Sequence, residues 1–114
     1  MSQQNYSGES PYSEREMGEF QTLLDIVRRL RAPGGCPWDR EQTHDSLKRN
    51  LLEESYEVLE AIDRGDPAIL ADELGDILVQ VVFHADIASQ AGDFELGDVL
   101  WAQLLSSSER VGTL

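Results

Sequence analysis

A Gly-Asp-Pro sequence at residues 65–67 separates two long runs of apolar residues at helical spacing, and it constrains the fold more than any other feature. Glycine commonly ends a helix, and Asp followed by Pro is a strong N-cap and first-turn pair. We therefore predict one helix that starts within residues 43–46 and ends at about Arg64, and another over 67–91. Since one or two residues join them, these helices should lie antiparallel and adjacent.

Two further helices are predicted on either side of this hairpin. Ser13 and Glu16 have the spacing of a capping box, and the apolar residues that follow recur at helical spacing over 14–31. The segment 32–42 contains two prolines and two glycines and is predicted to be a loop. A shorter helix is predicted over 96–105, and no segment shows the alternation typical of a strand. The expected fold class is all-α.

The 114 residues leave room for a single domain. We expect a disordered N-terminal tail over 1–12, where apolar residues are scarce, the folded domain over 13–106, and a flexible C-terminus over 107–114. A domain this small buries a modest fraction of its surface, so burial against a second copy would add considerable stability.

The charge balance argues against two classes of partner. Twenty-two Asp and Glu residues against nine Lys and Arg residues give a formal net charge of −13. Nucleic-acid binding and docking on an anionic membrane both depend on basic residues, so neither partner is expected. Cys36 is the only cysteine, no apolar run approaches the ~20 residues of a membrane span, and the N-terminus lacks the pattern of a secretion signal. We expect a cytoplasmic protein.

Four acidic residues are placed symmetrically about the predicted turn. Glu57 lies eight residues before Gly65 and Glu73 eight after it, while Glu54 and Asp76 lie eleven residues before and after it. At a rise of about 1.5 Å per residue, these pairs sit at matched heights of roughly 12 and 16 Å. The spacing of i, i+3 within each helix puts both acids on one face. If the two faces meet, four carboxylates converge.

Such a cluster is costly without a cation. Two like charges about 4 Å apart repel by roughly 4 kcal/mol at an effective dielectric constant of 20. A hard divalent ion would relieve this repulsion, and ligands that are all oxygen suit Mg²⁺, or Mn²⁺ in its place. Because Mg²⁺ accepts phosphate oxygens readily, a phosphate ester is the expected ligand. The alternative is a solvated acidic face, which is the usual meaning of a single E-x-x-E.

The motifs resemble those of a known family. They are E-E-S-Y-E at residues 53–57 and E-L-G-D at 73–76, with G-C-P-W-D-R-E-Q-T at 35–43 and L-V-Q-V-V-F-H-A at 78–85. Together they resemble the MazG nucleotide pyrophosphohydrolases. The resemblance implies a helical hairpin-based four-helix bundle completed by homo-oligomerisation, as a homodimer or homotetramer. It also implies Mg²⁺-dependent hydrolysis of (deoxy)nucleoside triphosphates to monophosphate and pyrophosphate, in nucleotide-pool housecleaning.

Carried over by position, the resemblance makes Glu54, Glu57, Glu73 and Asp76 the Mg²⁺ ligands. The hypothesis for the reaction is in-line attack of water on the α-phosphorus, with Glu53 or Glu57 polarising the water. Glu53 is turned about 100° from Glu54 on the helix, so it could equally hold a second ion or serve a structural contact.

Four residues are candidates for substrate binding. Gln80 and His84 continue the stripe of Glu73 and Asp76, so they are candidates to line the same groove, although a histidine so placed is more often structural. Trp38 could stack on a nucleobase or fill the core. Lys48 could reach phosphates, or lie in a solvated first turn.

Other functions remain open at this stage. The chain could be a non-catalytic module that binds metal or nucleotide and oligomerises, or an enzyme resembling phosphoribosyl-ATP pyrophosphohydrolase, although the C-P-W-D loop argues against the latter. The region after the last helix, usually basic in the family, has Arg110 as its only base.

Overall fold

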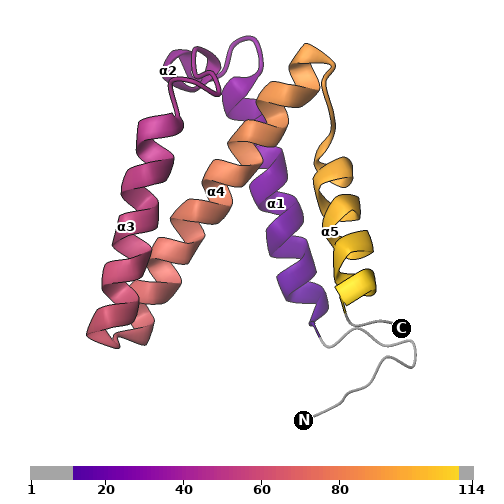
Figure 1. Cartoon of the computed structure of the whole chain (residues 1–114). Coiled ribbons are helices and arrows are strands. Elements are labelled where there is room, and N and C mark those ends of the chain that lie inside the picture. Colours follow the sequence, from indigo (N-terminus) through magenta and orange to yellow (C-terminus); the bar gives the residue numbers. More distant parts are fainter. Residues whose placement is uncertain (1–11, 111–114) are drawn as a thin grey trace.

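The computed structural model describes residues 12–110, and this part of the chain contains helices and no strand. The helices are α1 (Glu14–Arg31), α2 (Pro37–Arg40), α3 (Lys48–Arg64), α4 (Pro67–Ala91) and α5 (Leu96–Arg110). Helix α4 is the central element, since it contacts α3, α1 and α5 (Figure 1). The prediction of an all-α fold is confirmed. Among the described residues, no helix has the length and hydrophobicity needed to cross a membrane.

The hairpin of α3 and α4 forms as the sequence predicts. Gly65 ends α3 with a φ of 67°, a left-handed conformation that glycine adopts without a steric penalty. The Asp66 carboxylate then accepts hydrogen bonds from the backbone N–H groups of Ala68 and Ile69, at 3.1 and 3.3 Å. Helix α4 covers the predicted range of 67–91. The two helices lie side by side near the turn, and α4 continues past α3 across α1 (Figure 1).

Helix α1 also matches its prediction. The Ser13 hydroxyl accepts a hydrogen bond from the Glu16 N–H at 3.1 Å, and the Glu16 carboxylate accepts one from the Ser13 N–H at 3.0 Å. This is a capping box, in which each side chain satisfies a free backbone donor of the other residue. The hydrogen bond from the Ser13 N–H, with a second from the Ser13 hydroxyl to Glu16 Oε1 at 3.0 Å, lowers the pKa of Glu16.

Three helix boundaries differ from the prediction. The segment predicted as a loop contains the single turn α2, because Pro37 is already set for the first helical position. Helix α3 begins at Lys48 rather than within 43–46, since Thr43 and Ser46 bond to each other's backbone N–H groups and close a separate turn. Helix α5 continues to Arg110 rather than ending at 105, since serine reduces helix stability only slightly.

The predicted tail over 1–12 lies outside the described residues except for Tyr12. Of the predicted flexible C-terminus over 107–114, residues 107–110 form the end of α5 and residues 111–114 lie outside the described part.

A buried guanidinium fixes the connection between α1 and α3. Arg31 is 5% exposed, and its Nε donates to Asp86 Oδ2 and its Nη2 to Gln90 Oε1, both at 2.9 Å. Its Nη1 donates to the backbone carbonyls of Asp39 and Gln42. One side chain therefore ties α1, α4 and the segment around α2 together.

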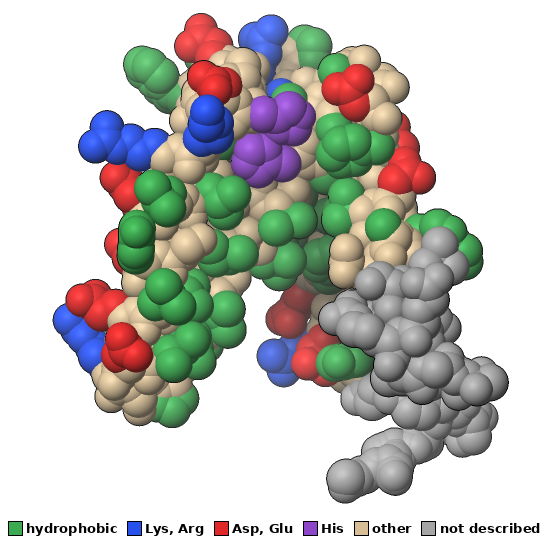
Figure 2. Space-filling view, viewed as in Figure 1, with side chains coloured by type: hydrophobic (Ala, Val, Ile, Leu, Met, Phe, Trp, Pro, Cys, Tyr) green, Lys and Arg blue, Asp and Glu red, His purple; other side chains and the backbone are tan. Residues whose placement is uncertain are grey.

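Much apolar surface remains uncovered on the hairpin. We define the apolar face of the hairpin as five side chains that are between 38% and 54% exposed: Leu51, Ile62, Leu74, Leu78 and Val81. Figure 2 shows hydrophobic side chains gathered over the hairpin and beside the hollow between it and the rest of the molecule. By contrast, side chains that are at most 5% exposed lie where α4 meets its neighbours: Val27, Ala61, Val82, Ala85 and Ala88.

Candidate metal centre

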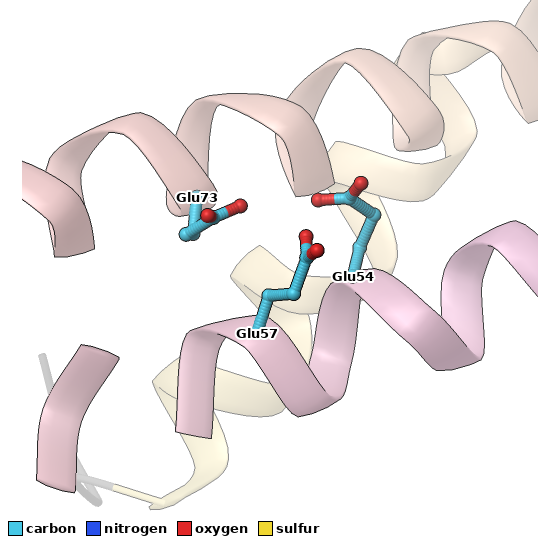
Figure 3. Close-up of side chains that lie close together, drawn as sticks. All are labelled: Glu54, Glu57 and Glu73. Atoms are coloured by element: carbon cyan, nitrogen blue, oxygen red, sulfur yellow. The ribbon is translucent and has the colours of Figure 1, made fainter. Parts of the chain in front are cut away.

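Three carboxylates converge between the two helices of the hairpin. Glu54 and Glu57 extend from α3 towards Glu73 on α4 (Figure 3). One carboxylate oxygen from each of these residues lies within 4.8 Å of the others. Glu54, Glu57 and Glu73 therefore lie together as the count of residues from Gly65 predicts, because two helices joined by a tight turn have the same rise per residue.

Asp76 lies beside this group without joining the set of three. It is exposed, and it lines the same cavity as Glu54. Burial raises the pKa of Glu54, and the charges of Asp76 and Glu57 raise it further. Asp76 is thus close enough to act on the charge of Glu54, as the matched spacing predicts.

The electrostatics of the group favour the binding of a cation. Loss of water contact, followed by the charges of Glu57 and Glu54, raises the pKa of Glu73 from its ordinary 4.5 to about 7. In addition, Oε2 of Glu54 is buried and has no hydrogen-bond partner in the described part of the chain. A buried acceptor without a donor is unfavourable, and a cation bound to that oxygen would satisfy it. The donor set, entirely carboxylate oxygen, fits a hard divalent ion.

A cavity of about 530 Å³ extends from the carboxylates towards the segment around α2. This volume lies within the range of small-molecule sites. Glu54 and Asp76 line its acidic end. The remainder of its wall includes amide, hydroxyl and apolar side chains: Gln42, Ser46, Leu47, Asn50, Val79, Gln80 and Phe83, with Asp39.

Gln80, predicted to bind substrate, is 5% exposed and lies in the wall of this cavity. Its Nε2 donates to the backbone carbonyl of Leu47 at 2.9 Å, and its Oε1 accepts from Asn50 Nδ2 at 2.9 Å. Gln80 therefore ties the start of α3 to the middle of α4. Only one amide hydrogen of Gln80 remains for a ligand.

His84 lies against a second histidine rather than against the carboxylates. Its ring stacks on that of His44, with centroids 5.0 Å apart, and the two Nδ1 atoms are 2.8 Å apart. Burial and the charge of His44 lower the pKa of His84. The Nε2 atom of His84 is buried and has no hydrogen-bond partner among the described residues. His84 is not part of the cavity wall.

Three other predicted site residues face solvent. The Glu53 Oε2 atom lies 3.4 Å from Arg49 Nε, on the exposed side of α3. Lys48 Nζ lies 3.3 Å from Asp45 Oδ1. The Trp38 side chain is 76% exposed, and neither it nor Lys48 lines the cavity.

Sequence reasoning missed Asn50, although the signal was present. Asn50 lies fifteen residues before Gly65 and Gln80 lies fifteen after it, so these residues form a third matched pair beyond the acids. The contributions of Asp39 and Gln42 to the cavity had no such signal, because the segment that carries them is positioned by Arg31.

Comparison with known proteins agrees with this geometry. Residues 42–106 match the family model of the MazG nucleotide pyrophosphohydrolase domain. The chain is 53% identical over 81 residues to the Thermotoga maritima "Nucleoside triphosphate pyrophosphohydrolase/pyrophosphatase MazG", which covers 71% of this chain and 32% of that protein. It is 50% identical over 84 residues to the Escherichia coli "Nucleoside triphosphate pyrophosphohydrolase", covering 73% and 32%.

A third relative is the "Uncharacterized protein YabN" of Bacillus subtilis, which is 52% identical over 82 residues, covering 72% of this chain and 17% of that protein. The chain thus spans a third or less of the length of these relatives. The family match includes all of α3 and α4, and with them the four acidic residues of the hairpin. Because the match covers more than half of its residues, the chain belongs to the MazG nucleotide pyrophosphohydrolase domain family.

Proposed function

We propose that this chain hydrolyses (deoxy)nucleoside triphosphates to nucleoside monophosphate and pyrophosphate, and so removes unwanted nucleotides from the cellular pool. One observation carries the proposal: carboxylate oxygens of Glu54, Glu57 and Glu73 lie within 4.8 Å of one another, and Glu54 also lines a cavity of about 530 Å³. The names of the relatives from Thermotoga maritima and Escherichia coli support the same reaction. A protein with a formal net charge of −13 needs a cation to take up a triphosphate.

Mg²⁺ is the proposed cofactor, and Mn²⁺ is its expected substitute. Glu54, Glu57, Glu73 and Asp76 are its proposed ligands. The buried, unpartnered Oε2 of Glu54 supports this assignment. When bound, the ion would neutralise charge on the triphosphate and polarise its phosphoryl oxygens.

For the chemical step, we propose that a water molecule attacks the α-phosphorus in line. A bond forms from the water oxygen to the α-phosphorus, the bond to the oxygen that bridges to the β-phosphorus breaks, and pyrophosphate leaves. The proton of the water passes to a carboxylate. Glu57 is better placed for this role than Glu53, because Glu57 belongs to the converging group while Glu53 pairs with Arg49 on the exposed side of α3.

Of the four candidates for substrate binding, Gln80 is the best supported, since it alone lines the cavity. Trp38 and Lys48 are exposed, so we propose that they approach a substrate only at the mouth of the site. His84 is engaged with His44, which supports a structural role more than direct contact.

We propose that the protein acts as a homodimer or homotetramer in which a second copy completes the four-helix core. The apolar face of the hairpin supports this, because contiguous exposed apolar surface usually marks an interface. The acidic balance and the single cysteine support a cytoplasmic enzyme that binds neither nucleic acid nor membranes.

The direct test is hydrolysis of nucleoside triphosphates with Mg²⁺ in water enriched in ¹⁸O, with the products separated by anion-exchange chromatography. The proposal predicts monophosphate and pyrophosphate, with ¹⁸O in the monophosphate. Diphosphate and orthophosphate as products, or ¹⁸O in the pyrophosphate, would show a different reaction. Calorimetric binding of Mg²⁺ and nucleotide without any turnover would instead favour a non-catalytic binding module.

A further inference from the structure

The matched positions on α3 and α4 continue beyond the acids in a definite chemical order. The four carboxylates of the hairpin lie eight and eleven residues from Gly65 on either side. The two amides, Asn50 and Gln80, lie fifteen residues from Gly65. Two apolar side chains, Leu47 and Phe83, lie eighteen residues from it. The two amides and both apolar side chains line the cavity that ends at Glu54. At these matched positions of the hairpin, the side chains that line the cavity thus change from acidic to amide to apolar, while Asp39, Gln42 and Ser46 add polar groups from the segment before α3.

The distances along this series follow from helix geometry. The amide pair lies four residues beyond Glu54 and Asp76, which is about 6 Å along the helices, and the apolar pair lies about 4.5 Å farther. A nucleotide carries the same order of chemistry, with phosphates at one end and a flat base of polar edges and apolar faces at the other. If the triphosphate of a substrate binds at the carboxylates, its base is therefore expected to lie near the two amides.

The orientation of the Asn50 amide is fixed by a relay of hydrogen bonds. The backbone carbonyl of Leu47 only accepts, so the group of Gln80 that faces it must be Nε2, at 2.9 Å. Gln80 Oε1 then accepts from Asn50 Nδ2 at 2.9 Å. The Asn50 Oδ1 atom lies on the other branch of its amide and accepts no hydrogen bond within the described part of the chain. Because the relay starts at a backbone carbonyl, the atom of Asn50 that remains available to a ligand is the acceptor Oδ1.

We propose that Asn50 is a specificity-determining residue that accepts a hydrogen bond from an amino or imino N–H group of the substrate's nucleobase, and that Gln80 is the residue that positions it. This inference rests on the proposed function for the direction of the triphosphate. Leu47, Val79 and Phe83 then provide the apolar surface against which the base lies. Gln80 is assigned the positioning role because its Nε2 is anchored on the Leu47 carbonyl while its Oε1 holds the Asn50 amide.

The test compares substrates with and without a base. ATP, GTP, CTP and UTP are compared with ribose 5-triphosphate for the wild-type protein and Asn50→Leu. The variant should raise KM for the preferred nucleoside triphosphate about tenfold, the effect of one lost hydrogen bond, and should raise KM for ribose 5-triphosphate much less. Gln21→Leu is the matched control, since it exchanges an exposed amide on α1 for leucine away from the cavity.

The role of Gln80 is tested by a double-mutant cycle. Gln80→Met keeps the approximate volume and removes both hydrogen bonds, so it should raise KM for the same nucleotide by a similar factor. If Gln80 acts through Asn50, the double variant should be little worse than either single variant. Additive effects would overturn the positioning role. Should Asn50→Leu fold poorly by circular dichroism, Asn50→Ala replaces it, since alanine is well tolerated in an exposed helix.

Binding provides a readout that does not depend on turnover. The dissociation constants of nucleotide analogues with an imido group between the α- and β-phosphorus are measured calorimetrically with Mg²⁺, alongside that of ribose 5-triphosphate. A selective loss of nucleotide affinity in Asn50→Leu supports the inference even if the wild-type protein hydrolyses none of the triphosphates. The absence of hydrolysis would contradict the proposed function but not the role of Asn50. Equal effects on both ligands, or no effect on either, would overturn the inference.

Discussion

Glu57 on α3 and Glu73 on α4 each lie eight residues from Gly65, and their carboxylate oxygens approach within 4.8 Å across the hairpin. The turn at Gly65 and Asp66 sets this relationship, because it leaves no spare residues by which one helix could shift against the other. The same register places Asn50 opposite Gln80, so that Asn50 Nδ2 donates to Gln80 Oε1 at 2.9 Å. A short turn therefore determines which side chains of α3 and α4 lie opposite one another.

Neutralising Glu73 should stabilise the metal-free protein. Glu73→Gln removes one of several converging negative charges, so Tm in EDTA should rise, by about 4–8 °C for each kcal/mol gained. The same variant should lose most of the increase in Tm that Mg²⁺ gives the wild-type protein, because a ligand stabilises only the state that binds it. Differential scanning fluorimetry with and without Mg²⁺ measures both effects. Glu19→Gln, on the exposed surface of α1, is the control.

The metal-free protein should lose stability as the pH rises from about 4.5 to about 7. The pKa of Glu73 is about 7 in the folded chain against an ordinary 4.5, so between these values the folded state binds more protons than the unfolded state. The free energy of unfolding of the metal-free protein must then fall as the pH rises from about 4.5 to about 7, and level off above pH 7. Urea denaturation in EDTA at a series of pH values measures this slope. Glu73→Gln should flatten it, and an unchanged slope in the variant would contradict the assignment.

Removing the guanidinium of Arg31 should be strongly destabilising. Arg31→Met leaves Asp86 without its cation in a site where the two side chains are 3% and 13% exposed. Loss of one partner of a buried ion pair typically costs about 3–5 kcal/mol. Arg15→Met, which breaks the exposed Arg15–Glu19 pair, should cost less than about 1 kcal/mol. Equal losses for the two variants in urea denaturation would show that Arg31 does not hold the α2 segment.

A charge on the apolar face of the hairpin should disrupt the proposed oligomer. Leu78 is 43% exposed, and Leu78→Glu places a carboxylate where the second copy is proposed to pack. Burying an unpaired charge is costly, so light scattering coupled to size-exclusion chromatography should show a smaller assembly than for the wild-type protein. Leu104→Glu, at a 60% exposed position on α5, is the matched control. A wild-type protein that is already monomeric would contradict the proposal itself.

The parts of the structure that could be predicted are those governed by local rules. Helical spacing, the Ser13 capping box and the turn at Gly65 each act over a few residues, and the acidic group follows from them by counting along two helices. The same count, applied to uncharged residues, also yields the Asn50–Gln80 pair.

The remaining features depend on how distant segments pack. Arg31 and Asp86 are 55 residues apart, and His44 and His84 are 40 apart, so neither pair follows from spacing within an element. The late start of α3 has a different cause. Thr43 and Ser46 satisfy each other's backbone donors as a helix cap would, yet they close a separate turn. Side-chain bonding of this kind competes with helix formation, and residue preferences alone do not predict the outcome.

The central claim, that the α3–α4 hairpin holds a divalent cation, is tested most directly by an anomalous difference map from crystals soaked in Mn²⁺. The account predicts a peak bounded by the carboxylates of Glu54, Glu57 and Glu73, with Asp76 beside it. A map without a peak at this place, with the three side chains turned apart towards solvent, would contradict it.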